Sequence, residues 1–155
     1  MNIIIIISFI ILLIDQIIKL LITSFFNVNN GITIINNFFD ITYVRNYGAA
    51  FSILDGNRLL LILISFLSLF LIYKFLIKDK KLSRLEIIVY GLLIGGLLGN
   101  LFDRVILGYV IDYLSFNIFG YHFPVFNLAD ICIVIGAGLI IFESFRSDKN
   151  GSRSN

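Results

Sequence analysis

The chain has 155 residues, of which 59% are hydrophobic and only 14% are charged. This balance excludes an ordinary soluble domain, whose surface needs far more polar residues, and it indicates a protein that lies in a lipid bilayer. A formal net charge of +2 is too small to indicate a nucleic-acid partner, and the one cysteine, Cys132, excludes an internal disulfide and a cysteine-based metal site.

Four apolar stretches are long enough to cross about 30 Å of hydrocarbon at about 1.5 Å of rise per residue. The stretches are residues 2–26, 58–77, 85–102 and 124–145, followed by a polar tail at 147–155 that we expect to be disordered. The first stretch lacks a basic leader and a small-residue cleavage site, so we interpret it as a retained span and not as an export signal. The sequence thus predicts an all-α membrane protein, a four-transmembrane-helix bundle that forms a single integral membrane domain over residues 1–155.

Basic residues concentrate in two segments, one between the second and third stretches and the other after the fourth. They are Lys74, Lys78, Lys80, Lys81 and Arg84 in the first segment and Arg146, Lys149 and Arg153 in the second. Because short cytoplasmic segments are enriched in lysine and arginine, we place both segments in the cytoplasm. Both termini are then cytoplasmic, and the other two connections face the outside of the membrane.

The two outer connections have the composition of β-strands. Residues 32–45 are rich in Ile, Thr, Phe, Tyr and Val, and residues 109–116 alternate in polarity between two glycines. Residues 46–51 contain Gly48, Ala49 and Ala50, which would allow the backbone to approach a neighbouring segment closely. The sequence therefore predicts a small extracytoplasmic β-rich segment above the helices.

An ionisable residue inside a membrane span costs about 3 kcal/mol or more, so it usually marks a functional site or pairs with a partner. Such residues and their amide neighbours lie near the outer ends of the predicted spans. They are Asp15 and Lys19 in the first span, Asn100, Asp103 and Arg104 in the third, and Asn127 and Asp130 in the fourth. Asp112 belongs to the outer connection between the last two spans, so it can reach the same level. The sequence therefore predicts one polar cluster near the outer face of the membrane.

These residues also have a purely structural interpretation, in which they hold the bundle together through hydrogen bonds and salt bridges between helices. The candidate pairs are Asp15 with Lys19 and Asp103 with Arg104. This interpretation is weaker for Asp112 and Asp130, because neither has a basic neighbour in the sequence to neutralise it.

Two carboxylates at the boundary of a bilayer could together catalyse the hydrolysis of a peptide bond. If Asp112 and Asp130 approach each other they cannot both ionise, so they share one proton. The ionised member would then take a proton from a water molecule, while the protonated member polarises a peptide carbonyl and later assists the leaving amine. This is the division of labour of an aspartic protease, and it needs no metal, cofactor or cysteine.

Five groups of residues, in chain order, carry a resemblance to a known family. They are Asp15-Gln16 with Lys19; Val44 to Phe51; Gly95-Gly96, Gly99-Asn100 and Asp103-Arg104; Val110 with Asp112; and Pro124, Phe126-Asn127 and Ala129-Asp130. Together they resemble the five signatures of lipoprotein signal peptidase, also called signal peptidase II. The resemblance covers nearly the whole chain and includes its size, its predicted number of spans and their orientation.

This resemblance implies that Asp112 and Asp130 are the catalytic pair. It implies supporting and substrate-binding roles for Asp15, Lys19, Asn46, Asn100, Asp103, Arg104, Asn127 and Ala129. The family cleaves the signal peptide of bacterial prolipoproteins just before a diacylglyceryl-modified cysteine, without a metal or other cofactor, on the outer side of the cytoplasmic membrane. The expected partners are therefore these lipidated signal peptides and membrane lipid, and globomycin is an expected inhibitor. Tyr113 departs from the family, which often has Phe there.

Other chemistry has weaker support from the residues. His122 lies between Tyr121 and Phe123, which is typical of an aromatic belt at a membrane surface. A nucleophilic pair of Cys132 with His122 lacks a third group to orient the histidine, so we expect Cys132 to pack in the interior.

Two other classes of protein remain as alternatives. A proton-coupled carrier or channel subunit would place acidic residues at several depths and often has an inverted repeat, and this sequence shows neither. A non-catalytic membrane scaffold would tolerate asparagine in place of Asp112 and Asp130.

Overall fold

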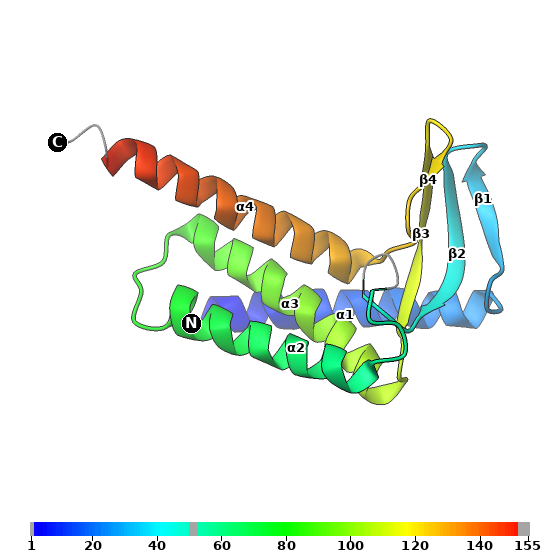
Figure 1. Ribbon diagram of the computed structural model, residues 1–155, viewed down its shortest axis with the longest axis horizontal. Coiled ribbons are helices and arrows are strands. Elements are labelled where there is room, and N and C mark those ends of the chain that lie inside the picture. Colours follow the sequence, from blue (N-terminus) through cyan, green and yellow to red (C-terminus); the bar gives the residue numbers. More distant parts are fainter. Residues whose placement is uncertain (1, 50–52, 152–155) are drawn as a thin grey trace.

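The computed structural model describes residues 2–49 and 53–151, which form helices and one small sheet (Figure 1). The helices are α1 (Asn2–Phe25), α2 (Arg58–Leu71), which continues into the π-helical segment η2 (Ile72–Ile77), α3 (Arg84–Ile106) and α4 (Leu128–Gly151). The strands are β1 (Gly31–Ile35), β2 (Phe39–Asn46), β3 (Val110–Ile118) and β4 (Tyr121–His122).

Three of the helical segments are long and apolar enough to cross a membrane: α1, α2 with η2, and α3. They agree with the first three predicted spans, and their outward faces carry exposed side chains such as Leu20 and Leu59. Exposed apolar residues on these faces are expected where lipid is the solvent. The protein is therefore a multi-pass membrane protein with a small antiparallel sheet.

The segment predicted as the fourth stretch differs from the prediction at both ends. Residues 124–127 are not helical, because Phe126 forms an isolated antiparallel bridge with Leu114 and α4 begins only at Leu128. At the other end α4 continues to Gly151, so the prediction of a disordered tail is wrong for residues 147–151. Residues 152–155 of that tail lie outside the described residues.

Helix α3 lies at the centre of the bundle and contacts the other three helices. Its glycines allow this packing: a Cβ on Gly95 would lie 2.7 Å from Ile11 of α1, and one on Gly96 would collide with the backbone oxygen of Ala129 in α4. These glycines therefore let α3 pack closely against both neighbouring helices. Since α1 and α4 both press on α3, the polar residues of all three helices come together.

The four strands form one antiparallel sheet in the order β1-β2-β3-β4. In Figure 1 this sheet stands at one end of the helices, opposite the connection between η2 and α3. It rests on the end of α1 through a buried cluster that includes Ile22, Tyr43, Ile111 and Tyr113. The strands β2 and β3, predicted from separate connections, pair so that Val44 lies opposite Asp112.

The ends of α3 are fixed by specific hydrogen bonds. Ser83 and Glu86 form a capping box at its start, with each side chain bonded to the backbone N–H of the other residue. At its end, Arg58 of α2 donates to the carbonyl oxygens of Arg104 and Val105, both at 2.7 Å. These contacts fix where α3 ends and hence where its polar residues meet the sheet.

Candidate active site

Asp112 lies on β3 with its side chain turned into the protein, where it is only 2% exposed. Its Oδ2 accepts a hydrogen bond from Nδ2 of Asn46 at 2.9 Å, and its Oδ1 accepts one from Nδ2 of Asn127 at 2.6 Å. Burial raises the pKa of Asp112 to about 7, and the charge of Asp130 adds to the rise. The two amide donors oppose the rise, so the pKa comes to lie near neutrality.

Asp130 lies in the first turn of α4. Its Oδ1 accepts a hydrogen bond from Nδ2 of Asn100 at 2.7 Å, and its Oδ2 accepts the backbone N–H of Asn127 at 3.2 Å. In return, the backbone N–H of Asp130 donates to Oδ1 of Asn127 at 3.0 Å. This reciprocal pair caps the start of α4, so the same contacts that begin the helix also orient the carboxylate.

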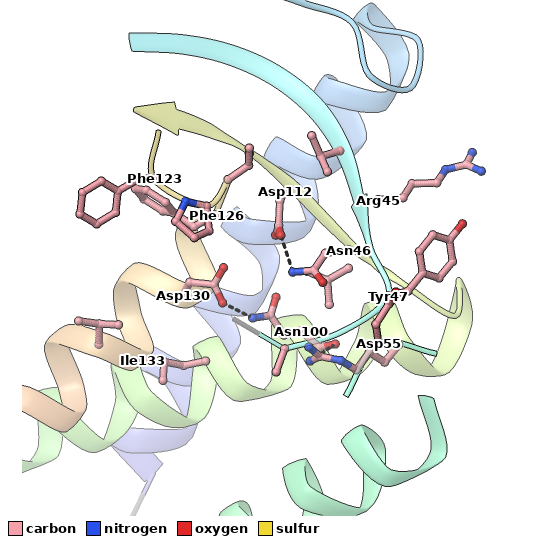
Figure 2. Close-up of a pocket in the computed structure, with 17 residues that line it drawn as sticks. Arg45, Asn46, Tyr47, Asp55, Asn100, Asp112, Phe123, Phe126, Asp130 and Ile133 are labelled. Carbon is pink, nitrogen blue, oxygen red and sulfur yellow. Dashed lines mark hydrogen bonds between the residues drawn. The ribbon is translucent and has the colours of Figure 1, made fainter. Parts of the chain in front are cut away.

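Asn127 joins the two acids. Its side-chain N–H groups contact Asp112 and also Oδ1 of Asn100 at 3.2 Å, while its backbone N–H contacts Asp130. The side chain is completely buried. Asp112 and Asp130 both line one cavity of about 620 Å³, and Figure 2 labels both of them among its lining residues. The fold thus brings both acids to the wall of one cavity.

A buried ion cluster lies next to the pair. The Lys19 ammonium contacts Oδ2 of Asp15 at 2.7 Å, Oδ2 of Asp103 at 2.8 Å and Oδ1 of Asn100 at 3.2 Å. All three charged side chains are at most 1% exposed. The ammonium has three N–H donors, and each of them has an acceptor.

The predicted pair of Asp15 with Lys19 is confirmed, and the predicted pair of Asp103 with Arg104 is wrong. Adjacent residues on a helix point in different directions, so Asp103 faces Lys19 of α1 instead. Arg104 donates to the carbonyl oxygens of Gly48 at 3.0 Å and Asn100 at 3.4 Å. Gly48 thus contacts α3, whereas Ala50 and Phe51 of that motif lie outside the described residues.

The ion cluster also holds the backbone beside each acid of the pair. The N–H of Ile111, just before Asp112, donates to Oδ2 of Asp103 at 3.2 Å. The N–H of Ala129, just before Asp130, donates to Oδ1 of Asp15 at 3.1 Å. Because Lys19 binds both of these carboxylates, one ammonium ties together the two backbone segments that carry the pair.

The ten site residues predicted from the sequence therefore belong to one connected network. Two further members were not predicted. Gln16 donates to Oδ1 of Asp103 at 2.9 Å, and its place beside Asp15 within a span was the available signal. The Tyr113 hydroxyl accepts a hydrogen bond from the backbone N–H of Leu128 at 3.1 Å. The alternating polarity of residues 109–116 does not predict this role for the hydroxyl.

The alternative nucleophilic pair, Cys132 with His122, does not lie at this cavity. His122 lies exposed on β4 and Cys132 is buried in α4, as expected, and neither lines the cavity. Among the described residues, no three His, Cys, Asp or Glu side chains are grouped so that they could hold a metal ion.

Comparisons with known proteins agree on one family. The family described as Signal peptidase (SPase) II matches residues 7–146. A lipoprotein signal peptidase of Halothermothrix orenii is 45% identical, with 94% of this chain and 97% of that protein covered. One of Staphylococcus aureus is 36% identical over 94% of this chain and 90% of that protein.

A solved structure has the same fold. It is titled as a bacterial membrane enzyme at 2.3 Å resolution, and it aligns with a TM-score of 0.89 at 35% sequence identity, covering 97% of this chain and 92% of that one. Sequence and structure therefore agree over almost the whole length, and the chain belongs to the signal peptidase II family of peptidases.

Proposed function

We propose that this protein removes the signal peptide from bacterial prolipoproteins, cutting just before the cysteine that carries a diacylglyceryl group. Membership of the signal peptidase II family and the relatives named lipoprotein signal peptidase support the reaction. The observation that carries the mechanism is the pair Asp112 and Asp130, held by side-chain amides on the wall of one cavity.

In the proposed mechanism the pair shares one proton, which resides on Asp112. Ionised Asp130 takes a proton from a water molecule, and the resulting hydroxide attacks the carbonyl carbon of the scissile peptide. Asp112 gives its proton to the carbonyl oxygen, which leaves a neutral gem-diol. Asp130 then protonates the leaving nitrogen as the C–N bond breaks, and one hydroxyl of the gem-diol returns its proton to Asp112. Both acids thus return to their initial protonation states.

The supporting residues keep the pair in place. Asn46, Asn100 and Asn127 supply the amide N–H groups that orient the two carboxylates. Asp15, Lys19, Asp103 and the backbone of Ala129 hold the segments around the pair, and Arg104 lines the cavity as a positive charge beside it. Preorganised donors of this kind need no rearrangement during the reaction, so they lower its barrier.

The proposed arrangement in the membrane places the sheet and the acid pair at the outer face. Helix α4 is then a fourth span, since 24 residues reach about 36 Å at 1.5 Å per residue. The basic connection after η2 and the end of α4 lie in the cytoplasm, as do both termini. Residues 1–155 form one integral domain in the cytoplasmic membrane of a bacterium.

The purified protein should convert a diacylglyceryl-modified precursor into two products, and mass spectrometry should place the cut immediately before the lipidated cysteine. Turnover should persist in excess EDTA, because the mechanism uses no metal, and should be blocked by globomycin. The same precursor without the lipid should be cut much more slowly. Absence of cleavage, or cleavage that EDTA abolishes, would contradict the proposal.

A further inference from the structure

The connection between η2 and α3 forms a separate cavity of about 430 Å³, at the end of the helices opposite the sheet (Figure 1). Lys78 and Lys80 line it together with apolar side chains such as Ile77 of η2 and Ile87 of α3. Among the described residues, none lines both this cavity and that of the acid pair. Pockets for small ligands range from about 300 to 1,000 Å³, so this cavity is large enough to hold one.

A tight turn brings the two lysines to the same cavity. The N–H of Lys78 donates to the carbonyl oxygen of Tyr73 at 2.8 Å, the i→i+5 bond that ends the π-helical segment η2. Asp79 then adopts a left-handed conformation with a φ of 59°, and the N–H of Lys80 donates to the carbonyl oxygen of Ile77 at 3.2 Å. This is the geometry of a type II β-turn, and both lysines beside its left-handed residue lie on the cavity wall.

The charge around the cavity is positive and unpaired. Neither Lys78 nor Lys80 forms an ion pair within the part of the chain that the structure describes. Asp79 also lines the cavity, and it offsets only one of the two charges. Residues 74–86 contain five basic and two acidic residues, so the whole connection has a net charge of +3. An anion in the cavity would meet two ammonium groups with N–H donors to spare.

The surface beside the cavity is apolar. Tyr73 lines the cavity and is also 46% exposed, and Phe75 of η2 and Leu85 and Ile88 of α3 are exposed as well. Such faces are expected to meet lipid in a membrane. A ligand that uses both features of this region would carry an anionic group for the lysines and a hydrocarbon chain for the apolar faces. A soluble anion would use only the lysines.

We propose that this cavity binds the headgroup of an anionic phospholipid, with the phosphate at Lys78 and Lys80 and an acyl chain against Tyr73 and the apolar faces of η2 and α3. The proposed orientation of the chain assigns this lipid to the cytoplasmic leaflet. That leaflet is rich in anionic lipids, and basic pockets between helices on this side recognise their phosphate groups. The bias of lysine toward cytoplasmic segments explains the charge of the connection. It does not explain a cavity with two of these lysines on its wall.

A single tryptophan can report on this cavity, because the chain has none. Tyr73→Trp places the indole on the cavity wall, and Phe75→Trp is a control on η2 that is exposed and does not line the cavity. The full-length variants are reconstituted in phosphatidylcholine vesicles that contain a brominated lipid as quencher. For Tyr73→Trp, brominated phosphatidylglycerol should associate about tenfold more strongly than brominated phosphatidylcholine. For Phe75→Trp the preference should be below twofold, and equal preferences at the two positions would overturn the inference.

Two double substitutions in the Tyr73→Trp background test the lysines, and each removes two positive charges from the same connection. In Lys78→Gln/Lys80→Gln the preference for phosphatidylglycerol should fall to about twofold or less. Lys81→Gln/Arg84→Gln changes two exposed residues that do not line the cavity, so the preference should stay within twofold of the parent. Equal losses would mean that the lipid responds to the charge of the whole connection, and they would overturn a defined site.

Thermal stability tests the site without an introduced tryptophan. In detergent, saturating dioleoylphosphatidylglycerol should raise Tm by about 4 °C for the chain with no substitution and for Lys81→Gln/Arg84→Gln, and it should leave Lys78→Gln/Lys80→Gln unchanged. Dioleoylphosphatidylcholine should raise none of them, and neither should inorganic phosphate, compared with sodium chloride at the same ionic strength. A rise with inorganic phosphate would indicate a site for a soluble anion and overturn the lipid assignment. A phosphatidylglycerol effect no larger than that of phosphatidylcholine would also overturn it.

Discussion

At the scale of single residues, the proton on Asp112 links structure to rate. Burial and the charge of Asp130 hold the pKa of Asp112 near 7, so its proton is lost as the pH rises through that value. The protonated acid is the one that polarises the carbonyl. We therefore expect kcat/KM to fall about tenfold per pH unit above about pH 7.

Substitution of Asn46 tests this expected pH dependence of kcat/KM. Its amide N–H stabilises the ionised form of Asp112 and so lowers the pKa. In Asn46→Ala the pKa should rise, and the alkaline limb of the pH–rate profile should move to higher pH even if the maximal rate is lower. A profile that is flat from pH 6 to 9, or an unmoved limb in the variant, would show that Asp112 is not the acid.

Lys19 is expected to act through position and not through contact with substrate. Replacing it by Met leaves Asp15 and Asp103 buried without their shared cation, and removal of one partner from such a buried group costs about 3 to 5 kcal/mol. Lys19→Met should therefore lower Tm strongly and reduce kcat more than it raises KM. Lys74→Met, at an exposed position, serves as the control.

A second substitution separates the effect of the unpaired carboxylate charges from the effect of lost packing. Adding Asp103→Asn to Lys19→Met removes one of the two unpaired carboxylates, so the double variant should melt at a higher temperature than Lys19→Met alone. Additive destabilisation would mean that the cluster is held by packing and not by its charges.

At the scale of elements, the glycines of α3 set the distance between helices. A Cβ on Gly99 would lie 2.6 Å from Oδ2 of Asp15, the atom that binds Lys19, whereas a Cβ on Gly138 of α4 meets nothing within 4 Å. Gly99→Ala should therefore lower both Tm and turnover. Gly138→Ala should be neutral or slightly stabilising, because alanine favours a helix by about 1 kcal/mol over glycine. Equal effects would mean that α1 and α3 are not in close contact at this point.

Elements that form through local interactions can be predicted from the sequence, whereas boundaries that depend on contacts between distant residues cannot. The apolar runs of α1, α2 and α3 determine spans locally, and the pair of Asp15 with Lys19 follows from helical spacing. The start of α4 could not be placed in the same way. The residues before it are as apolar as a span, and they are drawn out of the helix by the bridge between Phe126 and Leu114.

The same limit applies to the site. Motif order predicted which ten residues would meet, but it could not predict which atoms pair. Asp103 was expected beside Arg104, and it pairs instead with Lys19, which is 84 residues away in the sequence. The role of the Tyr113 hydroxyl could not be predicted either. Its partner, the N–H of Leu128, lacks an acceptor within the helix only because α4 begins at this residue.

At the scale of the whole molecule, the acid pair lies on β3 and in the first turn of α4, and Asp103 lies in the last turn of α3. Figure 1 shows β3 and these helix ends at the end of the bundle that carries the sheet. A carrier would need acids at several depths. The proposed orientation can be tested by single cysteines, since the native Cys132 is buried. Asn37→Cys, between β1 and β2, should react with a membrane-impermeant maleimide on intact cells, and Lys80→Cys should react only after lysis. Labelling of Lys80→Cys on intact cells would reverse the topology.

The central claim is that Asp112 and Asp130 act as one catalytic couple, and its most direct test is cleavage of a diacylglyceryl precursor by three purified variants. Asp112→Asn and Asp130→Asn should each lower kcat by at least about a thousandfold while the protein remains folded in the membrane. Asp40→Asn, an acid on β2 that lies outside the cavity, should cleave at the wild-type rate. Retained turnover in either of the first two variants would contradict the mechanism.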